Sequence, residues 1–255
     1  MEAVVLGGVR TTVRRWGSGV PTVVIAHSAG LDAASSQWFG AALAERGVQA
    51  ISIDLRGHGA SMSRPEDVSL DSIAHDLAEL PAALGLDQPH FVGTSLGGVV
   101  GSLAVRANPS GYRSMTIVCS PDRGHPAFVD RAARAEAAGM GAVTEETLER
   151  WFTVQQLADS TAPVDHARAA LTRMRTSQWS VLWRDFANFS GHPALGSTLP
   201  VHCIAGALDQ STPPAVMERV AADVGGTLEV IDGAPHQALM THANVIARLW
   251  AARNA

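Results

Sequence analysis

The chain has 255 residues, of which 46% are hydrophobic and 17% charged, so it can bury a sizeable core. The net charge is −5 and all 19 basic residues are scattered arginines, which argues against a nucleic-acid partner. No stretch approaches the roughly 18 apolar residues of a membrane-spanning helix, and the N-terminal residues do not resemble a signal peptide. We therefore expect a cytoplasmic protein without a membrane partner.

Two cysteines, Cys119 and Cys203, each close an apolar, strand-like run. Their spacing matches no zinc or redox motif. We expect both to be buried free thiols, as is usual in a reducing compartment. The sequence also predicts no metal site and no cofactor.

Eight segments have the apolar or alternating pattern of β-strands. They are residues 4–9, 12–16, 22–26, 50–53, 90–93, 113–119, 200–205 and 227–231. A glycine-containing bend separates the first two segments, and this pattern predicts an antiparallel hairpin. Helical patterns at residues 36–46, 70–84, 213–224 and 241–252, and one ending near residue 108, separate the later strands. This alternation predicts an α/β fold with a mostly parallel eight-stranded sheet flanked by helices.

Residues 122–192 interrupt the alternation, because they contain helical patterns and no strand-like run. The segment has no sheet of its own to pack against. We therefore expect a helical lid inserted after the sixth strand, over the active-site edge of the sheet. The core then consists of residues 1–121 and 193–255.

The sharpest motif is Gly93-Thr94-Ser95-Leu96-Gly97, between an apolar run and a helical pattern. A strand, a tight turn and a helix would hold the Ser95 hydroxyl clear of the sheet, and glycine suits the crowded positions on either side. The geometry also aims the N–H of Leu96 at whatever Ser95 attacks. Ser95 is therefore the candidate nucleophile.

A serine hydroxyl needs a neighbouring base. Of the ten histidines, His236 lies in a loop that leaves the last strand, at the edge where α/β proteins bind ligands. The acid that would orient it is Asp209, just past the seventh strand, because the chain order serine, aspartate, histidine matches this architecture. Asp122, just past the sixth strand, is the alternative acid.

An oxyanion needs donors that are fixed in advance. The N–H of Leu96 is one candidate, and the N–H of Ala29, in the loop after the third strand, is the other. His27 in the same loop is interpreted as a brace for the turn, and His58 as a weak site candidate.

These motifs occur in the order found in α/β-hydrolases, which the chain resembles over its whole length. Within that superfamily, Ala138-Gly139-Met140, residues 148–153 and residues 204–214 are similar to 3-oxoadipate enol-lactonases. The resemblance implies cofactor-free opening of an enol-lactone by Ser95, Asp209 and His236.

We also expect substrate contacts from the lid, whose later part carries more aromatic bulk than the lactonase pattern and so indicates an apolar or differently shaped substrate. Arg123 is the candidate partner of a substrate carboxylate, and Trp151, Trp179 and Trp183 are candidate pocket residues. Trp179 and Trp183, four residues apart, could equally pack the lid onto the body. The expected substrate is a small ester or lactone, and the sequence leaves the oligomeric state open.

Other functions that keep the same three residues are a carboxylesterase, an acyl-homoserine-lactone hydrolase, a carbon–carbon bond hydrolase and a perhydrolase. A ligand-binding receptor on a hydrolase scaffold is a further alternative. Dehalogenases and epoxide hydrolases are disfavoured, because they use an aspartate where this chain has Ser95.

Overall fold

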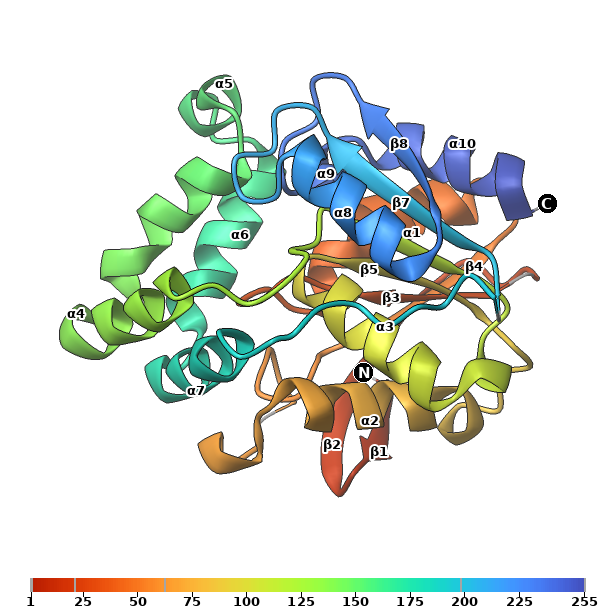
Figure 1. Cartoon of the computed structure of the whole chain (residues 1–255), viewed down its shortest axis with the longest axis horizontal. Helices are drawn as coiled ribbons and strands as arrows, with labels where there is room; N and C mark the ends of the chain where they lie inside the picture. The colour runs from red at the N-terminus through yellow and green to blue at the C-terminus, as the bar shows by residue number, and fades with distance from the viewer. Residues whose placement is uncertain (1, 21, 62, 198, 255) are drawn as a thin grey trace.

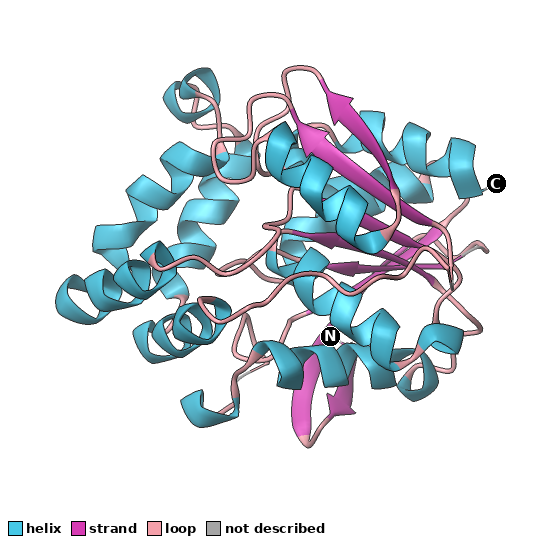
Figure 2. Cartoon of the chain, viewed as in Figure 1, coloured by secondary structure: helices cyan, strands magenta, loops and turns pink. Residues whose placement is uncertain are grey.

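The computed structural model describes residues 2–20, 22–61, 63–197 and 199–254. A single sheet runs through the core (Figures 1 and 2). Its strands are β1 (Glu2–Leu6), β2 (Val9–Trp16), β3 (Thr22–Ala26), β4 (Gln49–Ile53), β5 (His90–Thr94), β6 (Met115–Val118), β7 (Val201–Gly206) and β8 (Thr227–Ile231). Their order is β1-β2-β4-β3-β5-β6-β7-β8, with β1 and β2 antiparallel to their neighbours and all later pairs parallel. The predicted eight-stranded, mostly parallel α/β fold is confirmed.

Ten α-helices are assigned in the described chain. They are α1 (Gln37–Ala44), α2 (Leu70–Ala83), α3 (Leu96–Ala107), α4 (Ala127–Trp151), α5 (Val154–Ala158), α6 (Ala162–Arg173), α7 (Thr176–Phe186), α8 (Pro214–Val224), α9 (Ala238–Thr241) and α10 (Ala243–Asn254). Short 3-10 turns cover Ala33–Ser36, Pro65–Asp67 and Pro109–Gly111.

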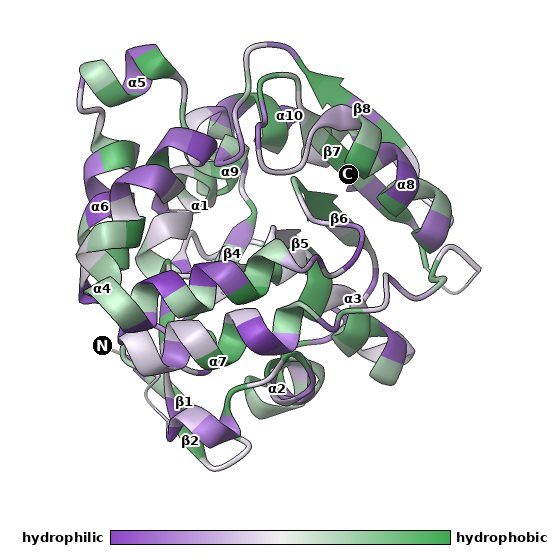
Figure 3. Ribbon diagram, turned by 60° about the vertical axis from the view of Figure 1, so that its left-hand side comes forward, coloured by the Kyte–Doolittle hydropathy of each residue, from purple (hydrophilic) through white to green (hydrophobic). Residues whose placement is uncertain are grey.

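Helices cover the sheet on both faces, so its central strands have no solvent-facing side. On one face α1 packs beside α10, where Phe39, Ile246 and Trp250 belong to one buried apolar cluster. On the other face α2 packs beside α3, within a larger cluster that extends to the helices between β6 and β7. Every residue of β6 and β7 is buried, and burial on both faces explains why both strands have mostly apolar sequences, coloured green in Figure 3.

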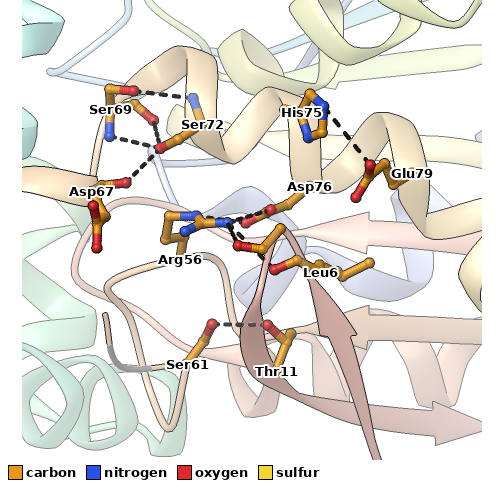
Figure 4. A network of polar contacts seen from close by, with 11 residues as sticks. Leu6, Thr11, Arg56, Ser61, Asp67, Ser69, Ser72, His75, Asp76 and Glu79 are labelled. Carbon is orange, nitrogen blue, oxygen red and sulfur yellow. Dashed lines mark hydrogen bonds and ion pairs between the residues drawn. The ribbon is translucent and has the colours of Figure 1, made fainter. Parts of the chain in front are cut away.

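A buried ion pair ties the first hairpin to the rest of the core (Figure 4). Arg56, in the loop after β4, donates to both carboxylate oxygens of Asp76 on α2, at 2.6 and 2.8 Å. Its Nη2 also donates to the carbonyls of Leu6 and Gly7 at the bend of the hairpin. Burial of the guanidinium is therefore matched by four acceptors, as a buried charge requires.

The chain between β6 and β7 contributes α4, α5, α6 and α7, a group we call the insert. It lies at one end of the sheet, on the left of Figure 1. Helix α4 is kinked at Gly139, where φ is 76°. The ion pair between Arg134 and Glu146, 2.5 Å long, shows that the two halves of α4 double back on each other.

Candidate active site

Ser95 is the single residue between β5 and α3. Its backbone conformation is rare for a residue other than glycine. Its φ is 54° and its ψ is −116°. The surroundings hold it there, because its N–H donates to the carbonyl of Val118 at 3.0 Å and its own carbonyl accepts from Ser120 Oγ at 2.9 Å. Such over-determined strain is typical of functional positions.

The two glycines around Ser95 are required by close backbone contacts. A Cβ at Gly93 would overlap the carbonyl of Gly97, and a Cβ at Gly97 would overlap the carbonyl of Ala26 at the end of β3. Glycine is the residue that removes these overlaps. The first turn of α3 therefore lies directly against the strand that leads into the loop containing Ala29.

Asp209 and His236 are in direct contact, both buried at the ends of β7 and β8. Asp209 Oδ2 lies 2.8 Å from His236 Nδ1. The carboxylate also accepts from the N–H groups of Ser211 and Thr212, at 2.7 and 2.9 Å, and from Thr212 Oγ1 at 2.6 Å. Burial alone would raise the pKa of Asp209, but the neighbouring His236 and these hydrogen bonds lower it to about 2.

This contact fixes the proton arrangement of the imidazole. An ionised Asp209 can only accept hydrogen bonds, so Nδ1 of His236 carries the proton. Nε2 is then the ring nitrogen that is available to take a proton from a nucleophile.

The alternative acid, Asp122, is engaged elsewhere. Its Oδ2 accepts from Arg219 Nε at 2.6 Å and from Arg123 Nε at 3.3 Å. The side chain of Arg123 is 58% exposed. The geometry thus joins Asp209, and not Asp122, to His236, and it gives Arg123 a surface ion pair.

The loop after β3 is braced by His27. Nε2 of His27 accepts from the N–H of Leu55 at 3.0 Å, so Nδ1 is the donor to the carbonyl of Ser28 at 2.9 Å. Burial lowers the pKa of His27, which keeps the ring neutral as both contacts require. In the described chain, the N–H groups of Ala29 and Leu96 donate to no other residue, which leaves both available to a ligand.

Two contacts of the site were not predicted from the sequence. Ser28 Oγ and the Gln237 side chain exchange hydrogen bonds at 3.2 and 3.3 Å, which joins the Ala29 loop to the residue after His236. Thr212 bridges Asp209 and His236, with Oγ1 3.3 Å from His236 Nδ1. A threonine three residues after an aspartate is a local turn pattern that could have indicated the second contact.

The insert covers this edge with aromatic side chains. Trp151, at the end of α4, stacks on His236 with ring centroids 6.1 Å apart and planes 28° apart. Trp179 on α7 is 1% exposed and lies beside Gly30, where an added Cβ would come within 2.9 Å of its ring. Both tryptophans therefore contact the loops that carry the candidate residues.

Behind Trp179 lies an arginine that sequence reasoning also missed. The ring of Trp183 is 5.4 Å from that of Trp179, and Cζ of Arg131 lies 4.6 Å from the Trp183 centroid. Burial lowers the pKa of Arg131 to about 10, and no residue of the described chain forms an ion pair with it. The indole N–H groups of Trp179 and Trp183 have no hydrogen-bond partner there either.

Among the residues that the structure describes, no group of three or more histidine, cysteine or carboxylate side chains is arranged to hold a metal ion. Within the same residues, no helix is both long and apolar enough to cross a membrane. Cys119 and Cys203 are free and buried.

Comparison with known proteins identifies the family and the fold. A sequence profile of the α/β hydrolase fold matches residues 21–243. The 3-oxoadipate enol-lactonase 1 of Acinetobacter baylyi is 28% identical over 158 residues, or 56% of this chain and 59% of that protein. The 3-oxoadipate enol-lactonase 2 of the same organism is 26% identical over 189 residues, or 71% and 70%. The enol-lactonase structure from Burkholderia xenovorans superposes with a TM-score of 0.87 at 21% identity, covering 98% of both chains.

The chain belongs to the α/β-hydrolase family. Among its relatives are proteins named as enol-lactonases and as an esterase, which supports an α/β-hydrolase enzyme. The similarity to 3-oxoadipate enol-lactonases seen in the sequence is confirmed, whereas identities below 30% leave the substrate of this chain to be argued from the site.

Proposed function

We propose that the chain is a serine hydrolase that opens a small lactone or ester bearing a carboxylate, as an enol-lactonase does. The observation that carries the proposal is the 2.8 Å contact between an ionised Asp209 and His236 Nδ1, on the same edge as the strained Ser95. An oriented imidazole within reach of a serine hydroxyl is the arrangement that activates that hydroxyl.

In the proposed reaction, Ser95 Oγ attacks the substrate carbonyl while His236 Nε2 takes its proton. The N–H groups of Ala29 and Leu96 hold the oxyanion. The tetrahedral intermediate collapses, the ring C–O bond breaks, and the leaving oxygen receives the proton from His236. Water then attacks the acyl-enzyme with His236 as base, which releases the acid and restores Ser95.

The insert would act as the lid of this site and bind the substrate carboxylate. Arg131 supports this role better than Arg123 does, because its guanidinium lies over the rings of Trp183 and Phe128 and forms no ion pair in the described chain, with Glu146 near enough only to raise its pKa. An unpaired buried cation is costly unless a ligand supplies the opposite charge. Trp151 and Trp179 would line the pocket that extends from the reacting bond towards this cation.

The test is stopped-flow hydrolysis of p-nitrophenyl acetate by the wild type and by Ser95→Ala. We expect a burst of about one equivalent that is absent from the variant, which reports an acyl-enzyme at Ser95. Ser110→Ala, a surface serine on the turn Pro109–Gly111, is the matched control and should keep the burst. Equal, burst-free rates in all three proteins would overturn the proposal.

A second comparison tests the carboxylate. Arg131→Gln should raise KM for an anionic lactone by about tenfold while changing KM for its neutral methyl ester little. Arg134→Gln, one turn along α4 and 57% exposed, is the control. A panel of neutral esters and acyl-homoserine lactones hydrolysed faster than the anionic lactone would favour a carboxylesterase or an acyl-homoserine lactonase instead.

The compartment is proposed on separate grounds. The free, buried state of Cys119 and Cys203 fits an enzyme that works in a reducing cytoplasm.

A further inference from the structure

A cleft of about 570 Å³ lies between the core and the insert, on the far side of the Ala29 loop. Its insert wall is the corner where α6 ends and α7 begins. Its core wall is β2 and the loops after β3 and β4. The lining residues are Thr12, Arg14, Gly30, Leu31, Asp32, Asp54, Gly57, Gly59, Ala60, Ala170, Arg173, Met174, Arg175 and Gln178. None of Ser95, Asp209 and His236 is among them, so this cleft is separate from the candidate active site.

The cleft is lined by arginines from both walls. Arg14 comes from β2, and Arg173 and Arg175 come from the corner of the insert. Arg14 and Arg175 are exposed and form no ion pair within the described chain. Nη2 of Arg173 lies 3.6 Å from Asp32 and the side chain is 64% exposed.

The carboxylates of the cleft are already satisfied. Asp32 accepts from His166 at 3.0 Å, and although burial would raise its pKa, that contact brings it to about 2. Asp54 accepts from the N–H groups of Ala33 and Ala60, both at 2.8 Å. Three arginines thus face two carboxylates whose oxygens are already hydrogen-bonded, which leaves the cleft with an excess of positive charge.

Gln178 adds a directional requirement. Gln178 is only 1% exposed, and its side-chain Nε2 donates to the carbonyl of Ser63 at 2.9 Å. Oε1 has no hydrogen-bond partner in the described chain. The amide cannot be turned over, because Ser63 O only accepts. A buried acceptor without a donor is unfavourable, so a ligand that offers a hydroxyl or N–H to Oε1 would gain a hydrogen bond.

We propose that this cleft binds a small organic polyanion that carries a hydroxyl group. Its acidic groups would lie between Arg14 on the core and Arg175 on the insert, and its hydroxyl would donate to Gln178 Oε1. Such a ligand would connect the insert to the core beside Gly30 without touching Ser95. The proposal does not depend on the reaction proposed above.

Isothermal titration of the full chain tests the ligand class. The probes are citrate, 3-phosphoglycerate, and tricarballylate, which is citrate without its hydroxyl, all at one ionic strength. We expect one equivalent of citrate or 3-phosphoglycerate to bind, and the tighter of the two tells whether carboxylates or a phosphate fit better. Tricarballylate should bind at least about fivefold more weakly than citrate, since it lacks the donor to Gln178. No binding by either hydroxylated anion, or equal binding by citrate and tricarballylate, would overturn the proposal.

Variants then locate the site. Arg14→Gln and Arg175→Gln should each weaken binding about fivefold or more, because each removes one charged contact. Arg10→Gln is the matched control, since Arg10 is exposed on the same strand and does not line the cleft. Equal weakening by Arg10→Gln would mean only general charge attraction and would contradict the proposal. Binding should persist in Ser95→Ala, and its loss there would place the anion in the candidate active site instead.

Discussion

The two loops that carry His27 and Asp209 differ from the helices of the insert in how their buried polar groups are paired, although His58 Nε2 and Ser63 Oγ after β4 also have no partner in the described chain. In the loops, the Asp209 carboxylate accepts four hydrogen bonds and both ring nitrogens of His27 are paired. In the insert, buried groups of Trp179, Trp183 and Gln178 have no partner in the described chain. Completed polar networks hold side chains in one position, whereas incomplete ones are suited to receive a ligand. We infer that the loops carry the chemistry and the insert the selection of substrate.

The variant with the largest expected effect on kcat is Asp209→Asn. The amide would donate to His236 Nδ1 and so favour the wrong tautomer, and kcat should fall by about 10⁴-fold. The fold should remain, as circular dichroism can check. Asp122→Asn, which leaves the contact with His236 intact, should keep kcat within about threefold of wild type. A small effect of Asp209→Asn beside a large one of Asp122→Asn would reverse the assignment of the acid.

A paired glycine substitution compares the two regions directly. Gly97→Ala places a methyl group against the carbonyl of Ala26 and should lower the free energy of unfolding by about 3 kcal/mol. Gly141→Ala, on an exposed helical position of α4 with open space around it, should raise it by about 0.5–1 kcal/mol. Urea denaturation measures both. Similar effects at the two positions would show that the turn at Ser95 is not as tightly constrained as the contacts indicate.

The pH dependence of stability tests the same contrast through the titration of buried groups. Burial lowers the pKa of His192 to about 4, so its contribution is complete above pH 6.5 and is lost as the pH falls towards 4. The pKa of Asp209 lies at about 2 because the bonds to its carboxylate outweigh burial, so its contribution, about 2 kcal/mol, is lost only between about pH 4 and pH 2. Stability should therefore fall in two stages.

Urea denaturation between pH 7 and pH 2.5 measures these stages. His192→Gln should reduce the first stage and Asp209→Asn the second. His58 and His202 also have pKa values lowered by burial, to about 3 and about 4, so part of the first stage should remain in His192→Gln. An Asp209→Asn variant that loses stability as steeply as the wild type below pH 4 would contradict this account.

The same contrast explains what the sequence could predict. The sheet and the turn at Ser95 are encoded locally, because alternation, apolar runs and glycine spacing each constrain a few neighbouring residues. The N-cap of α2 is a further local feature, since Ser69 exchanges hydrogen bonds with Ser72 three residues along. These features were therefore readable from short stretches of sequence.

Contacts between segments far apart in the chain could not be predicted from local sequence patterns. The bonds between Ser28 and Gln237 span 209 positions, and nothing in either local pattern indicates the other. Arg131 was missed for a related reason. Its burial depends on the kink at Gly139 and on packing against α7, whereas its sequence surroundings look like an ordinary helix surface. Arg123 attracted the prediction only because it follows the sixth strand.

The contacts of Arg56 connect the hairpin β1–β2 to the loops at the candidate active site. The guanidinium joins the bend at Leu6 and Gly7 to α2, and the next residue back, Leu55, donates to His27 below the Ala29 loop. The hairpin is thus connected through Arg56, Leu55 and His27 to the loop that carries Ala29, one of the two proposed oxyanion donors. For protein engineering, the N-terminal strands belong to the frame of the active site, and a split, a permutation or an anchoring point is better placed at the exposed end of α5.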